Sequence, residues 1–324
     1  MESCMKRLSA LMAVWLCLLC FTLPARAEWP ARPVKLLVPL PPGGTADSLA
    51  RILAEKLALI WNKPVVVENR PGGNGIIGSE ALARAAPDGY VIGMGNTTAQ
   101  VSNAFVYSRL PYDPERDFTP LAWLTSNPMF LIVHPSVPAR NLQEFIAYAK
   151  SHPGKLSYAS NGVGSSMHLA AALLMQETGI DMLHVPYKGM GAAVQDLVAG
   201  MVSATVDISS MNWVKQGKLR ALGVISESRY PGAPDVPSFG EQGLHGLEII
   251  SWLSLHAPAG LPADLQQRIN ADVNKVLDGD DVKADMAKLG FERRLGTRDA
   301  FKTMLENEVA RTKKLIEDAK IEVK

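Results

Sequence analysis

Hydrophobic and polar positions follow two alternating patterns along the first third of the chain. Val34–Pro39 is an apolar run that predicts a buried strand, and a Pro/Gly turn follows it. Apolar residues then recur at helical spacing over 49–60. Val65–Glu68 and Tyr90–Gly95 predict further strands, with a helix expected over Ile76–Ala86 between them. Strands that alternate with helices are typical of a parallel α/β sheet.

The middle third repeats this alternation, and the chain ends in helices. Asn141 and Glu144 have the spacing of a capping box and predict a helix start. Further strands are expected at Met129–Val133, Leu156–Ala159, Met182–Val185, Val202–Ile208, Leu219–Ile225 and Ile249–Ala257, with helices near 167–177, 192–199, 262–277, 282–289 and from 298. The pattern predicts a bilobed α/β protein. We expect lobe 1 to comprise residues 28–128 and 254–324, and lobe 2 residues 129–253, with crossing strands near 128–133 and 249–256.

The first 27 residues have the pattern of an export signal. Lys6 and Arg7 precede a stretch without charge, Leu8–Leu23, which is too short for a typical membrane-spanning helix. Pro24 follows, and Ala25-Arg26-Ala27 is a small-x-small cleavage sequence. An N-terminal membrane anchor is the alternative. We expect cleavage near Ala27 and a soluble, periplasmic mature protein, because no later apolar run approaches the length of a spanning helix.

Composition changes once this segment is set aside. The three cysteines, Cys4, Cys17 and Cys20, all lie within it, so the remaining 297 residues contain none. This excludes disulfides, a thiol nucleophile and cysteine-ligated metal sites. The charges of the remaining 30 basic and 31 acidic residues nearly cancel, so the chain lacks the excess of positive charge typical of proteins that bind nucleic acid.

The turn over residues 39–47 is the first candidate binding site. It joins a predicted strand to a helix start, where free backbone N–H groups and the helix dipole attract anions. Gly43 and Gly44 permit close approach of a ligand, Leu40 would border it, and Thr45 adds a hydroxyl donor. Asp47 would contact the ligand or, with Thr45, only cap the helix.

The stretch 160–168 has the same architecture in the other half of the chain. Ser160, Asn161, Gly164 and Ser165 provide hydroxyl, amide and glycine positions before a helix start. Two such helix N-termini facing each other would hold carboxylates without a cationic side chain. His168, in the first helical turn, would bind the ligand or pin the loop through a hydrogen bond.

Two more polar residues follow predicted strands. Asp207 ends the strand Val202–Ile208, where α/β sheets place ligand contacts, and would accept a hydrogen bond from the ligand or cap its own loop. Asn96 follows the strand Tyr90–Gly95 and would add a polar group at the cleft between the two turns.

Other chemistries find little support. Residues 73–78 spell G-x-G-x-x-G, but no acidic residue follows the next strand to bind a ribose, so these glycines are expected to shape a turn and a close helix–sheet contact. Ser165, Ser166, His168 and Asp207 contain the residue types of a serine hydrolase, but there is no G-x-S-x-G elbow. The histidines show no metal-ligand spacing. We expect no catalysis, no cofactor and no metal.

Several longer motifs are distributed over nearly all of the chain after the signal. They are Trp29-Pro30-Ala31-Arg32-Pro33-Val34 with Pro39–Asp47, Pro64–Gly72, Ala86–Tyr90, Leu110–Pro114, Ser157–Ser160, His184–Gly189, Gly217–Leu222 and Ala257–Gly260. Together these motifs resemble the Bug family, the extracytoplasmic solute receptors of tripartite tricarboxylate transport systems.

This resemblance implies a type II periplasmic-binding-protein fold with two α/β lobes. It also implies that small carboxylates are held by backbone amides, hydroxyls and water from one turn per lobe, here 39–47 and 160–168, with Asp207 at the family's aspartate position. Leu40 departs from the family, which usually has Phe there. The segment 208–217 is about two residues shorter than usual, and its Met211 and Trp213 are unusual.

The function expected from these observations is that of a periplasmic receptor for a di- or tricarboxylate, an acidic amino acid or an aromatic acid. Ligand that touches both lobes would favour their closure. The receptor would be a monomer that delivers its ligand to the membrane permease of a tripartite tricarboxylate-type system. The alternative is a sensory protein that presents the ligand to a two-component signalling kinase.

Overall fold

The computed structural model describes residues 29–247 and 249–318. Residues 29–31, with a cis peptide bond between Trp29 and Pro30, belong to a unit of their own, and the chain from Arg32 onward forms one compact unit. The expected export signal, residues 1–27, lies outside the described residues. Within the described ranges, no helix combines the length and the apolar character needed to cross a membrane.

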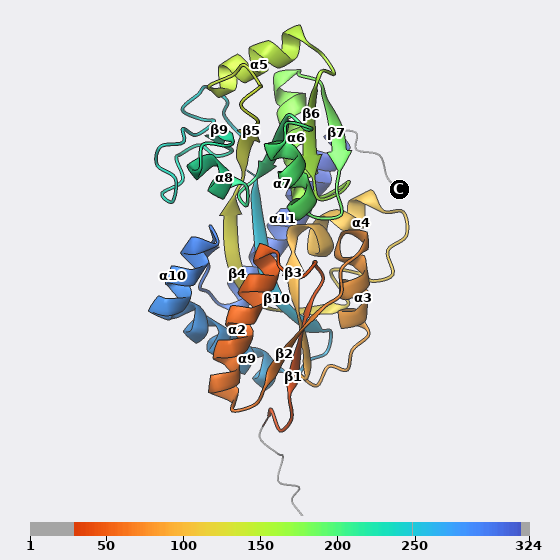
Figure 1. Ribbon diagram of the computed structural model, residues 1–324. Coiled ribbons are helices and arrows are strands. Elements are labelled where there is room, and N and C mark those ends of the chain that lie inside the picture. Colours follow the sequence, from red (N-terminus) through yellow and green to blue (C-terminus); the bar gives the residue numbers. More distant parts are fainter. Residues whose placement is uncertain (1–28, 248, 319–324) are drawn as a thin grey trace, which may run out of the picture. The chain divides into compact units, whose positions relative to one another are not determined.

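The unit that starts at Arg32 contains two β-sheets with helices around each (Figure 1). The first sheet has the strand order β11 (Glu292–Arg293), β4 (Phe118–Pro128), β10 (Ile250–Pro258), β3 (Val91–Asn96), β1 (Val34–Val38) and β2 (Val65–Asn69). The second has the order β7 (Met182–Pro186), β6 (Leu156–Ser160), β8 (Ala204–Asp207), β5 (Phe130–Val133) and β9 (Arg220–Val224).

The helices fall between these strands in chain order. With the first sheet come α2 (Thr45–Trp61), η1 (Gly73–Gly75), α3 (Ile76–Ala83), the π-helix η2 (Thr98–Ser102), α4 (Asn103–Val106), α9 (Ala263–Asp278), α10 (Asp280–Lys288) and α11 (Arg298–Asp318). With the second come α5 (Leu142–Ser151), α6 (Ser166–Thr178), α7 (Met190–Val198) and α8 (Met211–Lys215).

The chain crosses between the sheets twice, as the sequence predicted. β4 continues past Met129 into β5 of the second sheet, and the chain returns to the first sheet at β10. β4 and β10 pair antiparallel from Phe118↔Pro258 to Pro128↔Ile250, so the outgoing and returning strands lie side by side. The lobe boundaries, residues 28–128 with 254–324 and residues 129–253, remain a prediction.

The parallel pairing expected from alternating strands and helices is confirmed for part of each sheet. β1 pairs parallel with β2 and β3, and β6 pairs parallel with β7 and β8. β10 and β5, however, run antiparallel to their neighbours. The reason is the crossing, since a strand that arrives from the other sheet runs against the strands that it joins.

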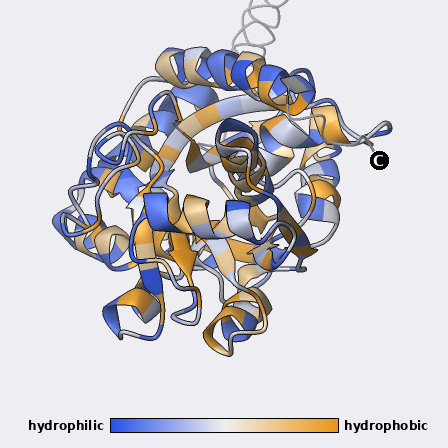
Figure 2. Ribbon diagram, turned by 90° about the horizontal axis from the view of Figure 1, so that it is seen from above, coloured by the Kyte–Doolittle hydropathy of each residue, from blue (hydrophilic) through white to orange (hydrophobic). Residues whose placement is uncertain are grey.

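Both faces of the second sheet are buried. Along β5, Leu131 and Val133 belong to one hydrophobic cluster, and Phe130 and Ile132 belong to another. Because successive side chains of a strand point to opposite faces, the two clusters lie on opposite sides of the sheet. Figure 2 shows strands rich in hydrophobic residues, surrounded by helices that carry both hydrophobic and hydrophilic residues. This explains why β5 appears as an uninterrupted apolar run in the sequence.

Local signals placed most helices correctly. The capping box is confirmed, because the Asn141 side chain accepts a hydrogen bond from the Glu144 backbone N–H at 2.8 Å. α6 ends at Gly179, which has a φ of 66°. The sequence analysis did not predict the 11-residue strand β4, the short strand β11, the 3-10 helix η1, the helical segment 98–106 or α8.

Candidate functional site

The first turn, residues 39–47, joins β1 to α2. α2 begins at Thr45, and Gly44 precedes it in an extended conformation with no side-chain cap. Gly43 has a φ of 80°, a region that favours glycine. Because the first backbone N–H groups of a helix have no acceptor inside the helix, this uncapped start offers donors to an anion.

Asp47 is tied to its own turn. Its side chain is buried and accepts hydrogen bonds from the Gly43 backbone N–H at 3.0 Å, from Arg51 at 3.0 and 3.1 Å, and from Asn69 at 2.9 Å. Burial alone would raise the pKa of Asp47, but the hydrogen bonds from Arg51, Gly43 and Asn69 outweigh it and hold the pKa below its ordinary value. Asp47 therefore shapes the turn without capping the first backbone N–H groups of α2, and its contact with ligand stays a prediction.

The second turn, residues 160–168, joins β6 to α6. Ser165 is the N-cap of α6, and its Oγ accepts from the His168 backbone N–H at 3.3 Å. The Nδ1 atom of His168 accepts from the Gly164 backbone N–H at 3.0 Å, so the ring pins the loop. Gly164 has a φ of 79°. The Oδ1 atom of Asn161 is buried without a hydrogen-bond partner among the described residues.

Three rings stack beneath the second turn. His168 lies 4.2 Å from His184 between ring centroids, and His184 lies 4.9 Å from Tyr158, with the rings of each pair nearly parallel. Ser160 Oγ is 2.6 Å from Nε2 of His184 and 3.1 Å from the Gly162 backbone N–H. The stack and Ser160 together fix the start and the end of the turn.

Asn74 joins the two halves of the candidate site. It lies in η1, which precedes α3, and donates from Nδ2 to the Val163 carbonyl in the second turn at 2.6 Å and to the Tyr107 hydroxyl at 3.2 Å. A Cβ atom on Gly162 would collide with the Asn74 side chain. A Cβ on Gly75, beside Asn74, would lie 3.5 Å from Pro39 in the first turn. Both turns therefore meet the same short segment.

Replacement of Asn74 should loosen this connection. Asn74→Ala removes both side-chain hydrogen bonds. This should make the free energy of association between the two halves less favourable by about 1 kcal/mol. Because the chain after residue 27 has no cysteine, spin labels can be attached at Leu59→Cys and Met201→Cys, both strongly exposed. We expect a longer or broader label-to-label distance distribution in the Asn74→Ala protein.

Asn62 provides the matched control. Asn62 and Asn74 are the non-glycine residues with positive φ in the described chain, at 49° and 56°. Asn62→Ala introduces the same kind of backbone strain at the exposed end of α2, and should leave the distance unchanged. An unchanged distribution in Asn74→Ala would show that Asn74 does not hold the halves together.

Asn96 and Asp207 lie at the strand ends where the sequence placed them. Asn96 ends β3 beside the first turn, and its Oδ1 accepts from the Ala99 backbone N–H at 2.7 Å. Asp207 is buried, and its carboxylate accepts from Ser209 Oγ at 2.6 Å and from the Ser210 N–H and Oγ at 2.8 Å each. These are loop-capping contacts, and ligand binding by either residue stays a prediction.

The segment 208–217 contains one short helix. It contains α8, which starts directly after the serines bound by Asp207. Met211 and Trp213 are half-buried and pack against the cluster of Phe130 and Ile132. Leu40 is also half-buried, and its carbonyl accepts from Asn69 at 3.1 Å.

The described contacts do not form a serine-hydrolase triad. Ser165 Oγ accepts from the backbone of His168, and the Asp207 carboxylate is engaged by Ser209 and Ser210. The Nδ1 atom of His168 accepts from the Gly164 N–H. A nucleophile, a base and an orienting acid would need to be hydrogen-bonded in series.

Sequence reasoning missed Asn74 and His184. Asn74 lies inside the G-x-G-x-x-G stretch that was set aside, although an asparagine between two glycines is itself a signal for left-handed backbone. His184 lies in one of the family motifs, but the sequence assigned it no role at the site. Its pairing with Ser160 follows from the register of β6 and β7, which sequence alone does not give.

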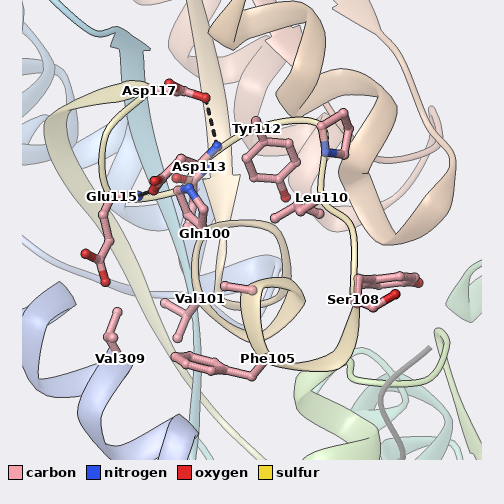
Figure 3. A pocket seen from close by; sticks show the side chains of 14 residues that line it. Gln100, Val101, Phe105, Ser108, Leu110, Tyr112, Asp113, Glu115, Asp117 and Val309 are labelled. Carbon is pink, nitrogen blue, oxygen red and sulfur yellow. Dashed lines mark hydrogen bonds between the residues drawn. The ribbon is translucent and has the colours of Figure 1, made fainter.

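The described residues also form a cavity of about 680 Å³ that contains none of the predicted site residues. It lies among η2, α4, the loop over 107–117 and Val309 of α11 (Figure 3). In the described part of the chain, no group of three or more His, Cys, Asp or Glu residues is placed to hold a metal ion.

Comparison with known proteins identifies a family. Residues 49–321 match the model of the tripartite tricarboxylate transporter family receptor. The chain is 32% identical to protein BugT of Bordetella pertussis, with 95% of each chain covered.

Solved structures agree with the fold. R. palustris Rpa4515 with adipate superposes with a TM-score of 0.87 at 33% identity, covering 92% of this chain and all of that one. The periplasmic binding protein BugD gives 0.84 at 31%, covering 91% and 100%. MatC from Rhodopseudomonas palustris with bound malate gives 0.83 at 31%, covering 89% and 100%. The Bug-family resemblance and the periplasmic-binding-protein fold predicted from sequence are confirmed.

Proposed function

Because the chain belongs to the tripartite tricarboxylate transporter receptor family, whose members are solute-binding receptors and not enzymes, we propose that it captures a small carboxylate between the two turns. One observation carries this proposal. Each sheet supplies one strand–turn–helix unit, and the segment around Asn74 contacts both units. The adipate and malate of the two similar structures are small dicarboxylates, which supports the same ligand class here.

The absence of basic side chains at the two turns is consistent with an anion held by helix dipoles. Residues 39–47 and 160–168 contain no Lys or Arg, and the nearby Arg51 is paired with Asp47 at 3.0 Å. The attraction for a carboxylate therefore comes from the N-termini of α2 and α6 and from hydroxyl groups. Ligand between the two units would stabilise the arrangement in which they face each other.

Calorimetric titration tests the proposal directly. Protein purified from a periplasmic extract is titrated with adipate, malate, citrate, aspartate, glutamate and benzoate. We expect at least one of these acids to bind with a 1:1 stoichiometry. If none gives heat or raises the melting temperature, the proposal of a carboxylate receptor is wrong.

Two hydroxyl substitutions test the location of the site. Thr45→Val and Ser165→Ala each remove one hydrogen-bond donor at a helix start. Each should lower the affinity for the bound acid by about tenfold, since a hydrogen bond to a charged group is worth about 1.5–3 kcal/mol. Ser48→Ala, one turn further into α2, removes a hydroxyl that donates to Gly44 O and should leave affinity unchanged. Unchanged affinity in both test variants would show that the carboxylate does not bind at these two turns.

We further propose that the receptor works as a periplasmic monomer after cleavage near Ala27 and delivers its ligand to a membrane permease. Support comes from the family, which is named for a tripartite transporter. Uptake of the labelled acid by cells should fall when the receptor gene is deleted. Normal uptake together with loss of a kinase-dependent transcriptional response would favour the sensory alternative.

A further inference from the structure

The cavity beside η2 has features of a second binding site. It is separate from the two turns and is bounded by η2, α4, the loop over 107–117 and α11 (Figure 3). η2 is a π-helix, a rare element that is found often at functional sites. The volume of about 680 Å³ is in the range of small-molecule sites.

Gln100 is the second and independent observation. It lines this cavity from η2 and is only 4% exposed, yet neither Nε2 nor Oε1 has a hydrogen-bond partner in the described structure. A buried amide with both ends unpaired costs free energy that nearly all folded proteins avoid. Such a group is explained if a ligand supplies the missing partners.

The charge of the cavity indicates the class of ligand. The lining residues include Asp113, Glu115 and Asp117, and none of them is Lys, Arg or His. Asp113 is engaged by backbone N–H groups and lies 3.6 Å from the exposed Arg116, and Asp117 Oδ2 accepts from the Asp113 N–H at 2.7 Å. The second oxygen of Asp117 and the carboxylate of Glu115 have no partner among the described residues, so they remain available to a cation.

The rest of the wall is apolar. Val101, Phe105, Leu110 and Val309 line the cavity together with the acidic residues (Figure 3). A hydrated metal ion would leave this surface without a contact. A ligand with a hydrocarbon portion would cover it.

We propose that this cavity binds a small organic cation, an ammonium or guanidinium group on a short carbon chain, oriented by Gln100. The cationic end pairs with Asp117 and Glu115. Gln100 Oε1 accepts an N–H of the same group, and Nε2 donates to a hydroxyl or carbonyl oxygen on the ligand. The binding of a carboxylate at the two turns is not needed for this proposal.

Titration with defined probes tests the class. Protein purified from a periplasmic extract is titrated with 5-amino-1-pentanol, 4-aminobutanamide and agmatine, and in parallel with 1,5-pentanediol and MgCl₂. We expect at least one amine to bind at least about tenfold more tightly than the diol and Mg²⁺. If no amine binds, or if the diol or Mg²⁺ binds as well as the amines, the proposal is wrong.

Three variants test the role of Gln100. Gln100→Leu and Asp117→Asn should each lower the affinity for the amine by about tenfold. Asp235 is an exposed acidic residue in the second half of the chain, and Asp235→Asn should leave this affinity unchanged. The melting temperature of Gln100→Leu should equal or exceed that of the unmodified protein, because the change removes unpaired buried polar atoms. Amine binding that survives Gln100→Leu, or a melting temperature several degrees lower, would show that Gln100 is structural and overturn its assigned role.

Discussion

Acidification from pH 7 to pH 5 should lower the free energy of unfolding by about 2 kcal/mol through His256 alone. His256 lies in β10, is 1% exposed and has Ser254 Oγ at 2.7 Å from Nε2, while Nδ1 has no partner in the described structure. Phe118 and Phe301 pack edge-on against the ring. Burial in this apolar setting disfavours the charged form and lowers the pKa of His256 from 6.5 to about 3.

The sign follows from proton binding. Between pH 6.5 and about 3, the unfolded chain binds a proton at His256 that the folded chain does not bind. The free energy of unfolding therefore falls as the pH is lowered through this window. Most of the carboxyl groups titrate below pH 5, so the interval from pH 7 to pH 5 isolates the histidine contribution.

Urea unfolding at the two pH values measures the effect. His256→Leu removes the titrating ring, and its loss of stability between pH 7 and pH 5 should be smaller than that of the unmodified protein by about 2 kcal/mol. His245→Gln is the control, because His245 is exposed and paired with Glu227 at 3.0 Å, and it should keep most of the acid sensitivity. If His256→Leu is as acid-sensitive as the unmodified protein, the buried ring is not the cause.

A methyl group at Gly78 should destabilise the fold by about 1–3 kcal/mol. Gly78 is buried in α3, and a Cβ there would lie 2.7 Å from Pro39 Cα, 2.8 Å from Pro39 Cβ and 2.8 Å from the Arg70 carbonyl oxygen. Two of these three atoms are backbone, so they cannot swing aside as a flexible side chain can. Gly78→Ala must push α3 away from the start of the first turn.

Gly191 gives a matched control within another helix. It is exposed in α7, and a Cβ there would meet no atom within 4 Å, so Gly191→Ala should stabilise the protein by about 0.5–1 kcal/mol. Denaturant unfolding of both variants checks the opposite signs. Because Pro39 opens the first turn, Gly78→Ala should also weaken carboxylate binding. Equal stability of the two variants would contradict the close packing of α3 on Pro39.

Much of the fold was predictable because its signals are local. β1 is mostly apolar, and β6 alternates apolar residues with serines. Both strands end in glycine-rich turns, and Asn141 with Glu144 specifies a helix start within a few residues. β4 was missed because polar residues such as Thr125 and Asn127 interrupt its apolar pattern. They are buried there because β4 lies between β10 and β11 in the sheet, which is a property of strand pairing.

The candidate site was predictable in position but not in contacts. Both turns were found because each combines glycine, hydroxyl residues and a helix start. Whether Asp47 faces a ligand or its own turn depends on Arg51 and on Asn69, which arrives from β2. No pattern along the chain specifies that Asn69 and Arg51 together donate hydrogen bonds to the Asp47 carboxylate.

By itself, the sequence determined most of the strands and helices of the two α/β halves, the two strand–turn–helix units and the family, since periodicity, turn chemistry and motifs act over a few neighbouring residues. Tertiary structure alone decided that Asn74 meets Val163, that His184 holds Ser160, and that Gln100 is left unpaired in a cavity. These outcomes depend on the strand register and on the packing of one half of the chain against the other. Long-range contacts of this kind leave no periodic trace in the sequence.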